Sequence, residues 1–298
     1  MSRKLIILIS GPTASGKTDI AIHLAQAFHT EIISADSRQC FKELNIGVAK
    51  PSAEQLTAVK HYFINSHSIT ETVNAATFEK YALGAAQDIF QHRDVVIMVG
   101  GTGLYIQAFC KGMDEIPEIP AHIRDQIISS YKQHGMEWLQ QQIEKHDIVY
   151  FTEGEMHNPQ RMMRALEVQL STGHSIKEFQ QKKSVERDFN VLKFAIDIPR
   201  EQLYKNINTR VDEMMQMGLL KEVISLMPFK QLNALQTVGY SELFAFLENK
   251  SDLNEAIGKI KTNTRHYAKR QLTWFQKDPE IKWMPKELLL EFVSNIKI

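Results

Sequence analysis

The chain has 298 residues, of which 43% are hydrophobic and 23% charged, and its 35 Lys and Arg balance 35 Asp and Glu. This composition excludes disordered, collagen-like and coiled-coil proteins and predicts a soluble globular protein with one large or two modest domains. No apolar run approaches the roughly 18 residues of a membrane span. The two cysteines, Cys40 and Cys110, cannot form a disulfide framework or a four-ligand zinc site, so we expect a cytoplasmic protein without membrane association.

Short apolar runs alternate with helical patterns along much of the chain. Helical spacing of four follows the first run, at Ile20, Leu24 and Phe28. Continuously apolar strands separated by helices are typical of a parallel sheet covered on both faces. We therefore predict an α/β fold, with strands over Leu5–Ile9, Glu31–Ala35, Val95–Val99 and Leu192–Ile198.

The pattern changes after residue 117, where long amphipathic stretches such as Ala121–Lys145 replace apolar strands. Pro117 and Pro120 open this region, and a charged run closes it. We predict a helical insertion domain over 118–192 within a core made of 1–117 and 193–298. Further helices are expected over Gln202–Met217 and Ser251–Phe275, and the closing run consists of Lys182, Lys183, Glu186, Arg187 and Asp188.

The first predicted strand and helix are joined by a phosphate-loop motif. Its pattern, G-x-x-x-x-G-K-[ST], lets backbone N–H groups converge on an anion, while Lys17 adds a full positive charge. The Thr18 hydroxyl is placed to ligate Mg²⁺. The motif predicts binding of a di- or triphosphate, ATP included, by Gly11, Pro12, Thr13, Ala14, Ser15, Gly16, Lys17 and Thr18.

A Walker ATPase would place an Asp at the end of a further strand to hold Mg²⁺. The run Val95–Val99 ends instead in glycine, although Asp197, in the fourth run, could substitute. A small-molecule kinase of the P-loop class therefore stays open as an alternative, and so does an RNA-binding regulator with a vestigial phosphate loop. A bound diphosphate leaving group would fit the same loop.

Several blocks, in this order, resemble the tRNA dimethylallyltransferase family, also called the tRNA isopentenyltransferases. The resemblance implies a P-loop NTPase-like core and transfer of a dimethylallyl group from dimethylallyl diphosphate to the exocyclic amine of the adenine 3′ of the anticodon, with Mg²⁺. The blocks are Gly11–Thr18, Asp36–Gln39, Gly100–Tyr105, Asn158–Arg161, Arg210–Asp212, Gly239–Tyr240 and Tyr267–Gln271.

An adenine amine is a poor nucleophile, so a carboxylate should remove its proton as the new bond forms. Asp36, at the end of a predicted strand, fits this role and that of its family counterpart, although it could also be a helix N-cap or a magnesium ligand. The resemblance implies that Arg210 offsets the charge of the departing diphosphate and that Thr102 lies near the reacting centre. From spacing alone, Arg210 could pair with Asp212 or Glu213, and Gly100–Gly103 could be a plain turn.

The resemblance also assigns tRNA contacts. The amide of Gln39 suits an adenine edge, Asn158 and Pro159 predict the start of a helix whose N–H groups could bind an anion, and Lys269 lies on a basic stripe with Lys261 and Arg265. Each basic stretch could equally be a solvated face, and Trp274 and Phe275 should pack in the core. The predicted tRNA contacts are Asp36, Ser37, Arg38, Gln39, Thr102, Arg124, Gln160, Arg161, Met162, Met163, Arg164, Lys269 and Arg270.

The sequence departs from the family pattern at three places near these blocks. Phe41 stands where a tyrosine is usual, Asn45 ends a stretch that is usually Gly-Met-Asp, and Asn65 stands where Asp is common. The proposed base, the phosphate loop and Arg210 are all retained. We expect a monomer.

Overall fold

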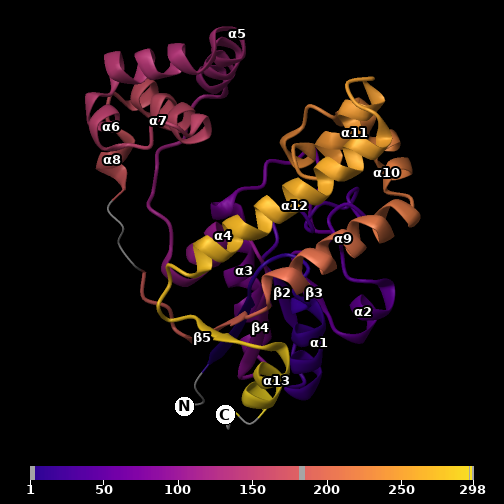
Figure 1. The fold of residues 1–298 in the computed structure, drawn as a ribbon. Coiled ribbons are helices and arrows are strands. Elements are labelled where there is room, and N and C mark those ends of the chain that lie inside the picture. Colours follow the sequence, from indigo (N-terminus) through magenta and orange to yellow (C-terminus); the bar gives the residue numbers. More distant parts are fainter. Residues whose placement is uncertain (1–3, 181–184, 295, 297–298) are drawn as a thin grey trace. The chain divides into compact units, whose positions relative to one another are not determined.

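The computed structural model describes residues 4–180, 185–294 and 296 (Figure 1). The chain divides into two compact units, Met1–Lys111 with Glu186–Ile298, and Gly112–Val185. The first, here called the core unit, contains the sheet. The second, here called the helical unit, contains α5 to α8.

All strand pairs of the core unit's sheet are parallel, in the order β3-β2-β4-β1-β5-β6. The central strand β1 pairs with β4 from Leu5 opposite Val95 and with β5 from Leu5 opposite Asn190. This confirms the predicted α/β class with a parallel sheet. The strands are β1 (Leu5–Ser10), β2 (Ile32–Ser34), β3 (His61–Tyr62), β4 (Val95–Val99), β5 (Asn190–Ile196) and β6 (Lys282–Met284).

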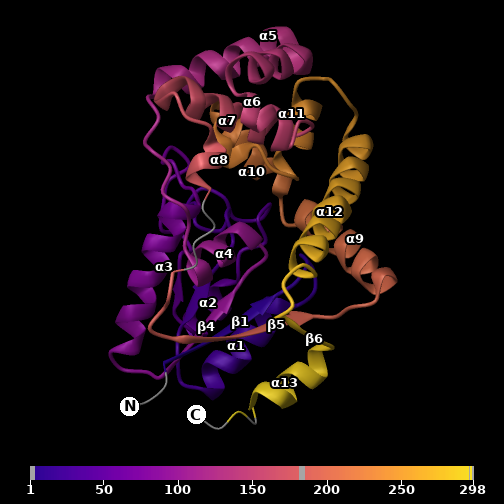
Figure 2. The same ribbon diagram turned by 90° about the vertical axis from the view of Figure 1, so that its left-hand side faces the viewer.

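Alternate residues of each central strand enter different apolar clusters, because successive side chains point to opposite faces of a sheet. Ile6 and Leu8 of β1 pack on the side of α3 and α4, whereas Ile7 and Ile9 pack on the side of α1 and α13 (Figure 2). Helices thus cover both faces. Those that directly flank the sheet are α1 (Lys17–Ala27), α3 (Ala75–Phe90), α4 (Gly103–Lys111) and α13 (Lys286–Ser294).

The C-terminal helices extend the α3 and α4 side of the core. Helices α9 and α12 contact each other, and Leu203, Ile207 and Ala268 from this pair pack against Ala14 of the phosphate loop (Figure 1). This packing fixes the loop between two long helices. The remaining helices of the core unit are α2 (Ala53–Ala58), α9 (Arg200–Gln216), α10 (Leu219–Leu226), α11 (Tyr240–Leu247) and α12 (Leu253–Phe275), with two short 3₁₀ turns, Met227–Phe229 and Asn233–Leu235.

The helical unit has its own apolar core, built where α5 packs against α7. Gly135 interrupts α5 with a φ of 75°, so the stretch predicted over Ala121–Lys145 is two helices joined at a kink. Glu167 of α7 is almost fully buried, and its carboxylate pairs with Arg164 at 3.2 Å and with Arg124 at 3.8 Å. The helices are α5 (Ala121–His146), α6 (Ile148–Glu153), α7 (Pro159–Thr172) and α8 (Ile176–Phe179).

The boundaries of the insertion differ from the predicted 118 and 192. Residues 190–192 belong to β5, and Arg187 is anchored to the core unit through Glu79 at 2.5 Å and the Phe109 carbonyl at 2.9 Å. The charged run was expected to close the insertion, but tertiary contacts of Arg187 place its last residues, from Glu186, in the core unit. Lys182 and Lys183 of the predicted closing run lie outside the described residues.

Candidate active site

The phosphate loop between β1 and α1 adopts a tight conformation that uses the left-handed region repeatedly. Gly11, Ala14 and Gly16 have φ values of 129°, 62° and 85°, a pattern of turns that orients successive N–H groups toward one concavity. The Ser15 hydroxyl and the Lys17 ammonium both donate to the Pro12 carbonyl, at 2.9 and 2.6 Å. Lys17 therefore lies folded against its own loop.

Burial is the main cause that lowers the pKa of Lys17, to about 7, and the positive charge of Arg210 lowers it further. The carboxylate of Asp36 acts in the opposite direction and raises it. These influences show that the loop lysine lies within electrostatic reach of the two other predicted functional residues. An anion bound in the loop would favour the charged form of Lys17.

Asp36 follows β2 and organises the turn after it. Its Oδ1 accepts the backbone N–H of Arg38 at 2.8 Å and that of Gln39 at 3.2 Å. The side chain therefore caps a turn over 37–40, not the helix considered from sequence. Both of these bonds are accepted by Oδ1, and Asp36 also lines a cavity.

One cavity of about 630 Å³ collects residues from loops far apart in the sequence. Parallel strands end at the same edge of the sheet, so the loops after β1, β2 and β4 meet there. The cavity places the predicted base beside the phosphate loop and the predicted cation. Its lining includes Gly16, Lys17, Thr18, Asp36, Gly100, Gly101, Arg210, Tyr267 and Gln271.

Thr102 links the loop after β4 to the Asp36 turn. Its Oγ1 accepts the backbone N–H of Ser37 at 3.1 Å, and its side chain lies near the hydroxyl of Tyr267 on α12. Burial, followed by the charge of Asp36, raises the pKa of Tyr267 to about 12, so its hydroxyl stays protonated near neutral pH. Thr102 is thus more than part of a plain turn.

The amide of Gln39 is already used within the protein. Its Nε2 donates to the carbonyls of Val48 and Ala49, at 3.3 and 3.0 Å, and its Oε1 accepts from the Ser34 hydroxyl at 3.2 Å. Contact between this amide and an adenine edge stays a prediction, and it would require these internal bonds to be exchanged. Gln39 instead holds the 48–49 segment that lines the cavity.

Two of the family departures meet at Lys50. Its Nζ donates to Oδ1 of Asn65 at 2.5 Å and to Oδ1 of Asn45 at 3.3 Å, and also to the Phe41 carbonyl at 2.5 Å. Burial is the main cause that lowers the pKa of Lys50, to about 8. The departures thus surround this ammonium with neutral acceptors.

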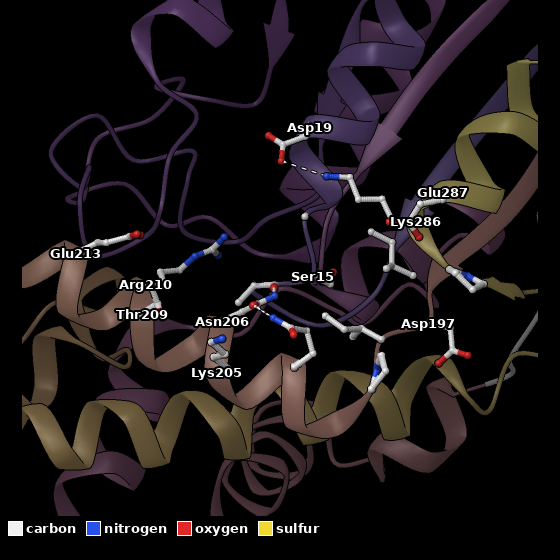
Figure 3. A pocket seen from close by; sticks show the side chains of 17 residues that line it. Ser15, Asp19, Asp197, Lys205, Asn206, Thr209, Arg210, Glu213, Lys286 and Glu287 are labelled. Atoms are coloured by element: carbon white, nitrogen blue, oxygen red, sulfur yellow. Dashed lines mark hydrogen bonds and ion pairs between the residues drawn. The ribbon is translucent and has the colours of Figure 1, made fainter.

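Arg210 of α9 lines the 630 Å³ cavity and also a second one of about 890 Å³, shown in Figure 3. Burial lowers the pKa of Arg210, partly offset by Glu213 and Asp19, yet a guanidinium keeps its charge in proteins. Asp197 lines only the second of these two cavities, whereas Thr18 lines only the first. Asp197 is therefore poorly placed to share a metal with Thr18.

In the basic stripe of α12, two side chains bond to α9 and two are exposed, one of which, Arg270, lies over the Tyr267 ring. Lys261 pairs with Asp212 at 2.6 Å, and Arg265 donates to Asn208 at 2.7 Å, both on α9. The stripe as a whole is therefore a helix-packing feature, and only Lys269 and Arg270 are exposed. Trp274 was expected in the core but is 39% exposed, lying close against Gly103, while Phe275 is buried.

Of the helical-unit residues predicted to contact tRNA, some are buried, some are exposed and some are held in ion pairs. Met162 and Met163 are buried in that unit's core, so their side chains are not available and this expectation is wrong. Gln160 and Arg161 are exposed, but their backbone N–H groups already bond Oδ1 of Asn158, at 3.1 and 3.2 Å. Arg124 and Arg164 are paired with the buried Glu167, as described above.

Sequence reasoning missed a clamp on the segment that precedes Val48. Glu222 of α10 accepts the backbone N–H groups of Asn45, Ile46 and Gly47, at 3.2, 2.8 and 3.1 Å, and the Tyr240 hydroxyl at 2.6 Å. A Cβ on Gly47 would overlap the Tyr240 ring. The family block Gly239–Tyr240 could have pointed to Tyr240 as one partner in this cluster. Glu222 lies in no motif, so nothing in the sequence indicated its role.

The donor set around the loop fits a loosely held magnesium ion. Among the described residues, no group of three or more His, Cys, Asp or Glu side chains could form a metal site. Mg²⁺, however, usually takes only one or two protein ligands and completes its shell with phosphate oxygens and water. Thr18 at the loop's end suits such a site.

Comparison with known proteins agrees with this geometry. Residues 39–278 match the family described as IPP transferase. The chain belongs to this family. It is 46% identical to the tRNA dimethylallyltransferase of Christiangramia forsetii, over 100% of this chain and 96% of that protein, and 44% identical to that of Flavobacterium johnsoniae, over 99% of each.

Solved structures of the family show the same fold. The full-length tRNA isopentenylpyrophosphate transferase of Bacillus halodurans superposes with a TM-score of 0.72 at 30% identity, covering 98% of this chain and 95% of that one. A eukaryotic dimethylallyltransferase acting on tRNA gives a TM-score of 0.78 at 26% identity, covering 95% of this chain and 74% of that one. The resemblance identified from motifs is confirmed, and with it the P-loop NTPase-like core. No helix among the described residues is long and apolar enough to span a membrane.

Proposed function

We propose that this chain transfers a dimethylallyl group from dimethylallyl diphosphate to the exocyclic amine of the adenosine 3′ of the anticodon in tRNA. The observation that carries the proposal is that Asp36, Lys17 and Arg210 line one cavity. A prenyl transfer of this kind needs a base for the amine and a cationic site for the leaving diphosphate, and this cavity offers both.

In the proposed reaction, the adenine amine attacks the allylic carbon while the carbon–oxygen bond to diphosphate breaks. Oδ2 of Asp36, which accepts neither of the turn N–H groups, takes the amine proton. The prenylated adenine is then neutral, and the carboxylate has become a carboxylic acid. Lys17, Arg210 and the N–H groups of the loop bind the diphosphate, which leaves with the bonding electrons. Mg²⁺ held at Thr18 would neutralise part of its charge.

The target adenine must leave the stacked anticodon loop before its amine can meet the allylic carbon. Thr102 holds the backbone N–H of Ser37, in the turn that would face the extruded base. We assign the remaining tRNA contacts to side chains that are exposed, together with Arg38, which is partly exposed. They are Arg38, Arg124, Gln160, Arg161, Lys269 and Arg270.

Mass spectrometry of tRNA nucleosides tests the proposal. After incubation with dimethylallyl diphosphate and Mg²⁺, tRNA should gain one dimethylallyl group at the adenosine 3′ of the anticodon, with one diphosphate released per transfer. A P-loop small-molecule kinase would instead consume ATP with a small acceptor and leave tRNA unmodified. An RNA-binding regulator would bind tRNA and yield no product.

A further inference from the structure

Gln271 of α12 joins the phosphate loop to the loop after β4. Its Oε1 accepts the backbone N–H of Thr13 at 2.7 Å, and its Nε2 donates to the Gly101 carbonyl at 2.9 Å. The side chain is buried, with 6% exposed. Both ends of the amide are needed, because a carboxylate could accept but not donate and an apolar side chain could do neither.

The amide of Gln271 lies directly against the backbone at Gly101. A Cβ on Gly101 would overlap Nε2 of Gln271, so this glycine is what admits the amide. Gly101 directly precedes Thr102, which supports the Asp36 turn through Ser37. Gln271 therefore connects the loop that holds the anion to the loop that supports the proposed base.

A second helix holds the next residue of the phosphate loop. Nδ2 of Asn206, on α9, donates to the Ala14 carbonyl at 3.1 Å, and Figure 3 shows Asn206 beside this loop on the same helix as Arg210. Ala14 has a φ of 62°, a conformation that is unfavourable for any residue with a Cβ and persists only where the surroundings hold it. The Thr13–Ala14 segment is therefore hydrogen-bonded to two helices, to α12 through Gln271 and to α9 through Asn206.

We propose that Gln271 and Asn206 are positioning residues that hold the Thr13–Ala14 segment in the conformation that receives the diphosphate group of the donor. This inference rests on the proposed function and adds to it. The bonds to Thr13 and Ala14 hold the strained turn in place before the anion binds. The backbone N–H groups of the loop residues after Ala14 therefore already point toward the anion site. The parent site then binds diphosphate without first ordering its loop.

Gln271→Met tests the proposal, since methionine matches glutamine in length and lacks both hydrogen-bonding groups. Calorimetric titration with diphosphate and Mg²⁺, without tRNA, should give roughly tenfold weaker binding, the factor that corresponds to loss of the one hydrogen bond to the phosphate loop, at Thr13. The KM for dimethylallyl diphosphate should rise similarly, while the KM for tRNA stays within about twofold. The control, Gln276→Met, changes an exposed glutamine at the end of the same helix and should match the parent.

Asn206→Ala provides an independent variant, because Asn206 is only partly buried and its removal leaves no cavity in the core. It should also weaken diphosphate binding, by about three- to tenfold. Parent-like diphosphate affinity in either folded variant would overturn the proposal, as would equal rises in both KM values. If the parent itself bound no diphosphate or modified no tRNA, the proposed function would fail instead.

Discussion

Oδ1 of Asp36 accepts the backbone N–H of Arg38 at 2.8 Å. The proposed base therefore also closes the turn that carries Ser37 and Arg38. Replacing Asp36 by alanine would remove the base and open the turn together. Asparagine keeps the Oδ1 acceptor and removes only the basic oxygen, so it is the variant that separates the two roles.

We expect Asp36→Asn to lower the single-turnover rate of prenyl transfer by about 10² to 10⁴, the usual contribution of a general base. The Kd for tRNA should stay within about threefold of the parent value, because the turn persists. Rapid-quench assays and filter binding measure the two quantities. An asparagine variant as fast as the parent would remove Asp36 from the mechanism.

Lys17 makes diphosphate binding dependent on pH. Its pKa of about 7 in the free protein means that a large share of Lys17 is neutral above pH 7, and a bound anion raises this pKa. Binding should therefore take up a proton above pH 7, and the affinity should fall as the pH rises by up to about tenfold per unit. Calorimetry in two buffers of different ionisation enthalpy measures the uptake.

Diphosphate itself titrates in the same range, so a control variant is needed. Lys17→Arg carries a charge at every pH used and should retain only the proton exchange of the ligand. The difference between parent and variant then belongs to Lys17. Equal proton uptake in both would show that Lys17 is already charged in the free protein.

Removal of Arg210 should affect the chemical step more than tRNA binding, since its charge is needed as the diphosphate leaves. We expect Arg210→Gln to lower kcat by about 10² to 10³, as loss of one preorganised donor does elsewhere. Steady-state kinetics at saturating tRNA measures this. Arg200→Gln, at the exposed start of the same helix, should leave kcat unchanged; a similar loss there would point to a general defect of α9.

The exposed Arg161 should act on tRNA through charge alone. For Arg161→Ala we expect weaker tRNA binding. The slope of log Kd plotted against log salt concentration should also decrease by about one. Thermal stability should not change. Lys132→Ala, an exposed cation on α5, is the matched control, and an equal change in its slope would mean that the effect is not specific to α7.

Arg164 differs from Arg161 because its partner is the buried Glu167. Arg164→Ala leaves that carboxylate with only the more distant Arg124 and should destabilise the helical unit by about 3 kcal/mol or more. Proteolysis within 112–185, compared with the parent, measures the loss. Arg164→Ala with Glu167→Gln should recover much of it, and no recovery would contradict the ion-pair explanation.

The clamp formed by Glu222 predicts an effect on global stability. Tyr240→Phe removes the hydroxyl that donates to the Glu222 carboxylate at 2.6 Å and changes nothing else in the packing. We expect the free energy of unfolding to fall by about 1.5 to 3 kcal/mol, the contribution of a hydrogen bond to a charged group. Urea unfolding measures it, and a change below about 0.5 kcal/mol would show that the carboxylate is satisfied by the loop alone.

The sequence predicted best where the determinant is local. The phosphate loop and the four main strands are encoded by glycine spacing and apolar runs, each of which acts within a few residues. Strand ends were displaced by one or two residues, as with β5, which begins at Asn190. The short edge strands β3 and β6 were missed, since two or three residues carry no periodicity.

Side-chain availability was predicted poorly, because it depends on what packs against a residue from elsewhere in the chain. Met162 lies within a predicted contact block yet is buried, Lys261 lies on a basic stripe yet pairs with Asp212, and the Gln39 amide is occupied by backbone carbonyls. None of these partners is adjacent in sequence. A stretch of charged residues alone does not tell which of its members face solvent.

The sequence by itself determined the class of fold, the phosphate loop and the chemistry open to Asp36, since these follow from residue types at short spacing. Only the tertiary structure decided which residues meet. Helices α9 and α12 bring Asn206, Arg210 and Gln271 to a loop nearly two hundred residues or more away. Such contacts arise from packing of the whole chain around one sheet, a cooperative property that no local pattern contains.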